Sequence, residues 1–267
     1  MKRKLNESSK GTVVLVHGAF EHSGRYEWLA NKWYEAGYNV IYGDLPGQGN
    51  SEGIKGHIDS FDEYIDKISE WIEAANYLQK PIFLLGHSMG GLAVVRALEE
   101  KELNVDGVIL SSPSLGICAR PPKWVRPLSK FLVKMVPTFK IKVPCRPWRS
   151  TRNEFFHNRN KIDPLILKKV SIHWYYELER AIEHAFKQIK KYPAVPTLLM
   201  QAGKDFLVNV KDVKNWFQSL PIEEKKFDEW NHLYHEIFNE PEREEVFSVA
   251  MEFANEVCEI KELEVEA

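Results

Sequence analysis

The chain carries a serine, an aspartate and a histidine at positions that suit an activated serine nucleophile. Ser88 stands in residues 86–90, GHSMG, between an apolar run at 81–85 and a segment of helical spacing at 89–98. A G-x-S-x-G sequence between a strand and a helix forms a sharp turn that presents the serine at a helix N-terminus, where negative charge is favoured. Glycine suits both flanking positions because a side chain there would collide with neighbouring backbone. We therefore predict Ser88 as the nucleophile.

A serine needs a base to take its proton and a carboxylate to orient that base. In chains with this turn, the acid follows the serine and the histidine comes last. Asp205 comes directly after the apolar run at 197–201, where a strand is expected to end. Asp212 lies at the start of a helical pattern and Asp228 within a further strand pattern. We therefore predict Asp205 as the acid.

Two histidines, His232 and His235, lie between the last predicted strand and the last predicted helix. His235 adjoins that helix and is predicted to be the base, whereas His232 is interpreted as a loop histidine. His87 is expected to be buried beside Ser88, and His17 to brace its own loop. Four further histidines are interpreted as surface or packing residues: His57, His157, His173 and His184.

The tetrahedral intermediate of acyl transfer needs two N–H donors aimed at its oxyanion. One is expected from Met89, the residue after the nucleophile, and the other from Ala19, in the loop after the first strand. The glycine-rich segment 44–51 is not followed by Gly-Lys-Ser, which argues against a phosphate-binding loop. We expect no metal and no cofactor.

The elements that position these residues alternate between strand and helix patterns. Strands are predicted at 12–16, 39–42, 81–85, 107–110, 197–201 and 226–230, and helices at 26–36, 61–77, 89–98, 210–220 and 242–260. Such alternation predicts an α/β fold with a mostly parallel central sheet flanked by helices. The pattern is interrupted between the two parts of this core, at 1–113 and 196–267. Residues 114–195 show no strand pattern and are predicted to be a helical insertion, with helices at 124–136 and 164–190.

The charge of the chain is distributed unevenly. The net charge is −2, but residues 114–195 hold 18 lysines and arginines against 5 aspartates and glutamates. Apolar residues of 124–136 fall on one helical face and lysines mostly on another, a pattern typical of a segment that lies on an anionic membrane. The same pattern fits a helix that packs on the core and leaves its lysines in solvent. Both interpretations remain open, and no nucleic-acid partner is expected.

The chain shows no run of about 20 apolar residues of the kind that spans a bilayer, and no apolar segment follows its basic start. Its three cysteines, Cys118, Cys145 and Cys258, are widely spaced and are interpreted as unpaired thiols. We therefore expect a cytoplasmic protein, and reversible peripheral contact with the inner face of the membrane stays one of the two open interpretations of the basic segment.

These residues together resemble a known family. The HGA of 17–19, the EHSGRY of 21–26, the GHSMG turn, Asp205 and His235 are similar to those of monoacylglycerol lipases and bacterial lysophospholipases of the α/β-hydrolase superfamily, the bacillar phospholipase branch above all. The resemblance implies the α/β-hydrolase fold with a helical cap, and a serine carboxylic-ester hydrolase that cleaves single-acyl lipids through an acyl-enzyme. It implies that Ser88, Asp205 and His235 form the triad and Ala19 and Met89 the oxyanion hole. It also implies substrate contacts from Phe20, Glu21 and Arg25, the last two near the head group.

Two features depart from that family, and several activities stay open. Family members have about two strands before the one that ends at His17, whereas about ten residues precede it here, so the first hairpin is expected to be shortened or absent. Phe238 stands where animal monoacylglycerol lipases carry a second histidine, so glycerol recognition does not carry over. Ser88 argues against dehalogenases and epoxide hydrolases, and a complete triad against a non-enzymatic receptor. A lysophospholipase acting on anionic lysolipids, an amide hydrolase and an acyltransferase remain as alternatives.

Overall fold

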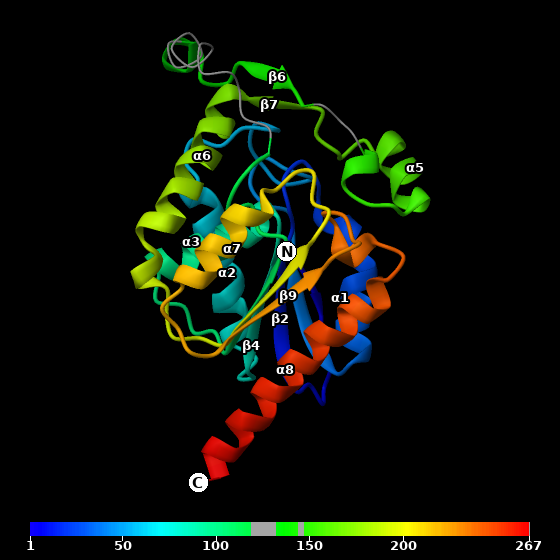
Figure 1. Cartoon of the computed structure of the whole chain (residues 1–267), viewed down its shortest axis with the longest axis vertical. Coiled ribbons are helices and arrows are strands. Elements are labelled where there is room, and N and C mark those ends of the chain that lie inside the picture. Colours follow the sequence, from blue (N-terminus) through cyan, green and yellow to red (C-terminus); the bar gives the residue numbers. More distant parts are fainter. Residues whose placement is uncertain (119–131, 144–146, 267) are drawn as a thin grey trace.

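A seven-stranded sheet forms the centre of the molecule (Figure 1). The computed structural model describes residues 1–118, 132–143 and 147–266. The sheet order is β1-β3-β2-β4-β5-β8-β9, and every neighbouring pair is parallel except β1 and β3. This arrangement confirms the predicted mostly parallel sheet. The strands are β1 (Lys2–Lys4), β2 (Gly11–Val16), β3 (Tyr38–Tyr42), β4 (Ile82–His87), β5 (Gly107–Ser111), β8 (Thr197–Ala202) and β9 (Lys225–Trp230).

Helices cover both faces of the sheet, and each face has its own apolar core. On one face α2 (Asp62–Asn76), α3 (Met89–Glu100), α6 (Ile172–Lys187) and α7 (Val210–Ser219) pack on β2, β4 and β5. On the other face lie α1 (Glu27–Glu35) and α8 (Arg243–Glu266). Trp33, which belongs to α1, is fully buried in the core of this face. Strands covered on both sides need continuous apolar sequence, which is why residues such as Val13–Val16 read as unbroken runs.

The N-terminal hairpin is reduced to a single edge strand. β1 pairs antiparallel with β3, with Lys2 opposite Tyr42 and Lys4 opposite Val40. The prediction of a shortened first hairpin is therefore confirmed. A short edge strand with three basic residues resists pairing with another chain.

The segment between β5 and β8 adds a small layer at one end of the molecule (Figure 1). It contains α5 (Glu154–Ile162), α6 and a two-stranded sheet of β6 (Lys140–Lys142) and β7 (Lys169–Ser171). The prediction that residues 114–195 contain no strand is therefore wrong. These strands have three residues each and no apolar run, so alternation had too few positions to show.

The helices of this segment also differ from expectation. The helix predicted at 164–190 begins only at Ile172, because Ser171 caps it by accepting a hydrogen bond from the Trp174 amide at 3.0 Å. α5 was not predicted, since its sequence is largely polar. Most of the helix predicted at 124–136 lies outside the described residues, within which 132–135 are helical. No helix in the described part of the chain has the length and apolarity needed to cross a bilayer.

Candidate active site

The turn that carries Ser88 is strained, and its shape is imposed by the contact between β2 and α3. Ser88 has φ +53° and ψ −120°, a conformation that L-residues rarely adopt. A Cβ at Gly90 would lie 2.4 Å from the carbonyl oxygens of Val16 and His17, and one at Gly86 would lie 2.7 Å from the Gly90 oxygen. Glycine at position 90 lets the turn approach β2 this closely, and glycine at position 86 lets the turn lie against the start of α3. The strained turn therefore places Ser88 at the N-terminus of α3.

The structure brings Ser88, His235 and Asp205 together as a chain of hydrogen bonds. The Ser88 hydroxyl lies 2.8 Å from Nε2 of His235, and Nδ1 of His235 lies 2.7 Å from Oδ2 of Asp205. Asp205 follows β8 and His235 follows β9, so both loops open at the same edge of the sheet as the Ser88 turn. Because a carboxylate only accepts, Nδ1 donates to Asp205, and Nε2 is left to accept from Ser88.

The carboxylate of Asp205 is held in one direction by backbone donors. Its Oδ1 accepts hydrogen bonds from the amides of Leu207 at 2.8 Å and Val208 at 2.9 Å. Of the rival residues, Asp212 lies in α7, Asp228 in β9, and His232 is exposed.

Burial and ion pairing shift the pKa values of Asp205 and His235 in opposite directions. Burial raises the pKa of Asp205, but His235 and the two amides outweigh it and hold that pKa below its usual value. Burial lowers the pKa of His235, but Asp205, Glu236 and Glu21 outweigh it and leave that pKa raised. The site therefore favours an imidazolium at His235, the species that forms when a base takes the serine proton.

The backbone amides around Ser88 differ in whether the described part of the chain offers them an acceptor. The amide of Gly18 donates to Oε1 of Glu21 at 2.6 Å, and that of Phe20 donates to Oε1 of Gln48 at 2.6 Å. Within the described part of the chain, no acceptor is recorded for the amides of Ala19 and Met89. The two amides predicted as donors are therefore the ones that their neighbours leave unpaired.

A second hydroxyl lies against the nucleophile and was not foreseen from the sequence. The Ser114 hydroxyl is 3.2 Å from the Ser88 hydroxyl, and the Ser114 amide donates to the Ser88 carbonyl at 2.9 Å. Since the Ser88 proton points to His235, Ser114 is the donor of the hydroxyl pair. Nothing in the local sequence SSPS at 111–114 signals this contact.

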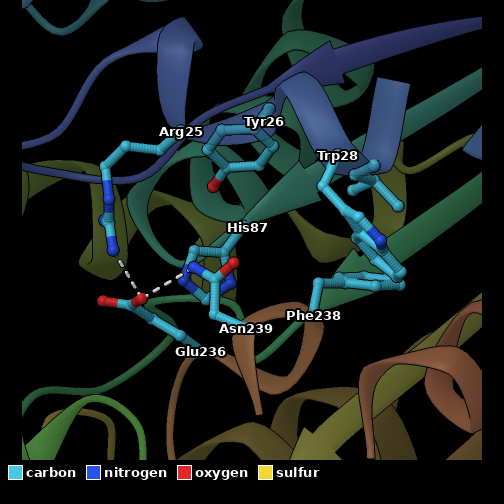
Figure 2. A pocket seen from close by; sticks show the side chains of 8 residues that line it. Arg25, Tyr26, Trp28, His87, Glu236, Phe238 and Asn239 are labelled. Atoms are coloured by element: carbon cyan, nitrogen blue, oxygen red, sulfur yellow. Dashed lines mark hydrogen bonds and ion pairs between the residues drawn. The ribbon is translucent and has the colours of Figure 1, made fainter. Parts of the chain in front are cut away.

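The residues predicted to contact substrate lie beside the nucleophile turn, and two of them are deeply buried. Glu21 and Arg25 are 4% and 6% exposed and form an ion pair with each other. Arg25 also donates to Glu236 at 2.6 Å (Figure 2). Phe20 has φ +67°, and its ring centroid lies 5.0 Å from that of Trp174 in α6. Contact of these residues with a substrate stays a prediction, and the charged atoms of Glu21 and Arg25 are already engaged.

Two histidines next to the site have supporting positions. His17 accepts from the Leu45 amide at 2.9 Å through Nε2 and donates to its own loop at the Gly18 carbonyl. His87 is buried, and its ring centroid lies 4.9 Å from that of His235. Burial, and then His235, lower the pKa of His87 to about 4, so its ring stays neutral at physiological pH. Both locations agree with the positions expected for these two residues.

A serine activated by a histidine and an aspartate, at the carboxyl edge of a mostly parallel sheet, is the arrangement of serine hydrolases with the α/β-hydrolase fold. The family model described as Serine aminopeptidase, S33, matches residues 7–242, and the chain belongs to this family. The chain is an ester hydrolase of the lipase and lysophospholipase type.

The named proteins to which this chain is similar include a phospholipase and two monoacylglycerol lipases. Phospholipase YtpA of Bacillus subtilis (strain 168) is 43% identical over 245 residues, which cover 91% of this chain and 95% of the relative. The monoglyceride lipase of Homo sapiens is 27% identical over 89% of this chain and 79% of its own length. The crystal structure of the Paleococcus ferrophilus monoacylglycerol lipase superposes with a TM-score of 0.85 at 32% identity, covering 97% of this chain and 98% of that one.

Proposed function

We propose that the chain hydrolyses single-acyl lipid esters, monoacylglycerols first, through an acyl-enzyme on Ser88. The observation that carries this proposal is the pair of hydrogen bonds, 2.8 Å and 2.7 Å, that joins Ser88 to His235 and His235 to Asp205. The named relatives support the lipid substrate, since a monoacylglycerol lipase covers 97% of this chain at 32% identity.

The proposed reaction has two half-reactions. His235 accepts the Ser88 proton as Oγ bonds to the ester carbonyl carbon, and the amides of Ala19 and Met89 hold the resulting oxyanion. The ester C–O bond then breaks, and His235 gives its proton to the leaving glycerol oxygen. Water next gives a proton to His235 and attacks the acyl carbon, which releases the fatty acid and restores Ser88 when the proton returns to it.

A lysophospholipase acting on anionic lysolipids is the second candidate. Two observations favour it: the relative at 43% identity is named a phospholipase, and the basic insertion offers charge for a phosphate head group. An amide hydrolase is the third candidate, because the family is described as a serine aminopeptidase and the triad chemistry is shared.

Hydrolysis of 1-monolauroylglycerol, lauroyl-lysophosphatidylcholine, lauroyl-lysophosphatidylglycerol and an aminoacyl nitroanilide separates these candidates. We expect the glycerol ester to be cleaved at least about ten-fold faster than the others, a margin of ~1.4 kcal/mol in transition-state binding. Faster cleavage of lysophosphatidylglycerol would establish the second candidate, and faster cleavage of the anilide the third. The Ser88→Ala enzyme is expected to lose activity by at least about 10⁴-fold; if it stays active, the proposed triad is wrong.

We also propose that residues 114–195 act as a cap that docks reversibly on anionic membrane. Large apolar side chains are exposed between basic ones near β6: Met135 is 67% exposed, Phe139 46% and Ile141 43%. Lys134, Lys140 and Lys142 are exposed around them. Apolar side chains that enter the head-group region, ringed by lysines, suit the surface of an anionic leaflet.

A further inference from the structure

Glu236, the residue after His235, forms three hydrogen bonds with its neighbours. Its Oε2 accepts from Nη2 of Arg25 at 2.6 Å and from Nδ2 of Asn239 at 2.8 Å (Figure 2). Its amide donates to the Ser150 carbonyl at 2.7 Å. The Glu236 side chain is 10% exposed, so these bonds form away from bulk water. The backbone next to His235 is therefore fixed by its neighbour's side chain and main chain together.

The same arginine reaches the loop that carries the Ala19 amide. Arg25 pairs through Nη1 with Glu21, whose Oε1 accepts from the Gly18 amide at 2.6 Å and from the Tyr26 hydroxyl at 2.7 Å. Gly18 directly precedes Ala19, the predicted oxyanion donor. A continuous chain of buried hydrogen bonds thus runs from the His235 loop to the oxyanion loop. We call these three side chains, Glu21, Arg25 and Glu236, the Glu21–Arg25–Glu236 clamp.

The charge of this clamp does not cancel. Two carboxylates share one guanidinium, which leaves a net charge of about −1 in a buried position beside His235. A buried negative charge near an imidazole favours its protonated form. Among the described residues, the charged groups that act on His235 are Asp205 after β8, Glu21 in the oxyanion loop and Glu236 in its own loop, and the His87 ring packs against it; Arg25 pairs with both glutamates.

We propose that Glu236 is a positioning residue for the reaction, which fixes the His235 loop against the oxyanion loop through Arg25 and Glu21 and stabilises the imidazolium at His235 by its charge. This inference rests on the catalytic role proposed for His235. It gives the carboxylate next to the base a function separate from that of Asp205, which bonds the imidazole directly.

The ionisation of Glu236 agrees with this role. Burial raises its pKa, but the adjacent Arg25 outweighs burial and brings that pKa to about 2. Glu236 is therefore a carboxylate throughout the pH range in which His235 titrates. Its charge is among the causes that raise the pKa of His235.

The test is the Glu236→Gln variant, which keeps the shape of the side chain and removes its charge. We expect kcat on a soluble p-nitrophenyl butyrate substrate to fall about ten-fold, with KM changed by less than about two-fold. The acidic limb of the kcat/KM profile reports the base in the free enzyme and should move to lower pH by roughly half a unit or more, since half a unit corresponds to a ~3-fold change in proton affinity.

Two further variants separate charge from geometry. Arg25→Lys keeps the net charge of the clamp but loses the planar two-sided contact, so kcat should fall while the acidic limb stays in place. Glu245→Gln removes an exposed carboxylate on α8 and serves as the matched control, with kcat and pH profile expected to equal those of the unmodified enzyme. Melting temperature and titration of Ser88 with a fluorophosphonate measure the fraction of each variant that is folded and competent.

The kinetics of these variants decide whether Glu236 has the proposed role. If Glu236→Gln matches the unmodified enzyme in kcat and in its acidic limb, the inference is wrong. It is also wrong if kcat falls only in proportion to the competent fraction while the limb stays in place. If instead Ser88→Ala or His235→Ala keeps full activity, the proposed function itself fails and Glu236 is not the reason.

Discussion

At the scale of single residues, the nucleophile has two hydrogen-bonding partners rather than one. Ser88 donates to His235 and accepts from Ser114, which is 6% exposed and therefore shielded from water. A donor to the serine oxygen stabilises the negative charge that develops there as the proton leaves. In the proposed reaction, the Ser114 hydroxyl is therefore expected to act on the charge that develops at the Ser88 oxygen.

Replacing Ser114 should therefore slow the reaction without weakening substrate binding. A neutral hydrogen bond contributes about 1 kcal/mol, so we expect Ser114→Ala to lower kcat about five-fold and leave KM within about two-fold. Ser114→Thr keeps the hydroxyl and should recover most of the rate. Steady-state kinetics on a soluble ester measures both variants, and equal rates for Ser114→Ala and the unmodified enzyme would refute the role of this hydroxyl.

The buried carboxylates also predict how stability depends on pH. The pKa of Glu236 is about 2 in the folded protein against 4.5 for an ordinary glutamate. A carboxylate with a lowered pKa stabilises the fold above its ordinary pKa, and that stabilisation is lost as the pH falls towards the lowered value. We expect the free energy of unfolding to fall between about pH 4.5 and pH 2. Urea titrations across this range should show a smaller decline for Glu236→Gln, and an equal decline would contradict the assignment.

Local signals in the sequence pointed to three side chains that the structure brings within hydrogen-bonding distance of one another. The Ser88 turn has a five-residue pattern, and Asp205 and His235 each follow a recognisable strand. The Arg25–Glu236 pair joins residues 211 positions apart, and neither partner lies in a pattern that points to the other. Arg25 was predicted to contact substrate and Glu236 had no predicted role, because only the folded loops bring these two side chains together.

At the scale of elements, the sheet core was predictable and the insertion was not. β2, β4, β5 and β8 are covered on both faces, so each reads as an apolar run that ends in a turn. β6 is exposed along its whole length, β7 buries Val170 and Ser171, and the six residues of the two strands include three lysines. Strands of three residues give apolar–polar alternation too few positions to show in the sequence.

The contact between the nucleophile turn and β2 gives a prediction at this scale. Gly90→Ala would place a methyl carbon 2.4 Å from two carbonyl oxygens, so the turn must move away from β2. We expect the free energy of unfolding to fall by roughly 2–3 kcal/mol and activity to fall with the displaced Ser88. Gly53→Ala is the control: nothing lies within 4 Å of its added carbon, and its positive φ costs only about 1 kcal/mol. Chemical denaturation of both variants checks this, and equal losses would show that the close approach is not limiting.

At the scale of the whole molecule, acidic residues predominate in the sheet core and basic residues in the segment between β5 and β8. The acidic core carries the sheet, and α5, β6 and β7 of the basic segment lie at the end of the molecule opposite the C-terminus of α8 (Figure 1). Glu240, fully buried, ties the two parts by accepting from Thr151 and Arg152. A molecule with one basic end orients that end towards an anionic surface from a distance, because its charges act together.

This division predicts that docking depends on the lysines near β6 and on salt. Changing Lys134, Lys140 and Lys142 to Gln should weaken binding to phosphatidylglycerol vesicles roughly 100-fold at low salt, since each lysine near such a surface contributes ~1 kcal/mol. The same change at Lys187, Lys190 and Lys191, which are exposed at the far end of α6, is the matched control and should have a much smaller effect. Vesicle sedimentation at two salt concentrations measures this, and binding of the unmodified protein to phosphatidylglycerol should weaken as salt screens the surface. Equal binding to phosphatidylcholine and phosphatidylglycerol vesicles would show that the basic end does not dock by charge, and would leave the positive insertion to act on the head group of the substrate instead.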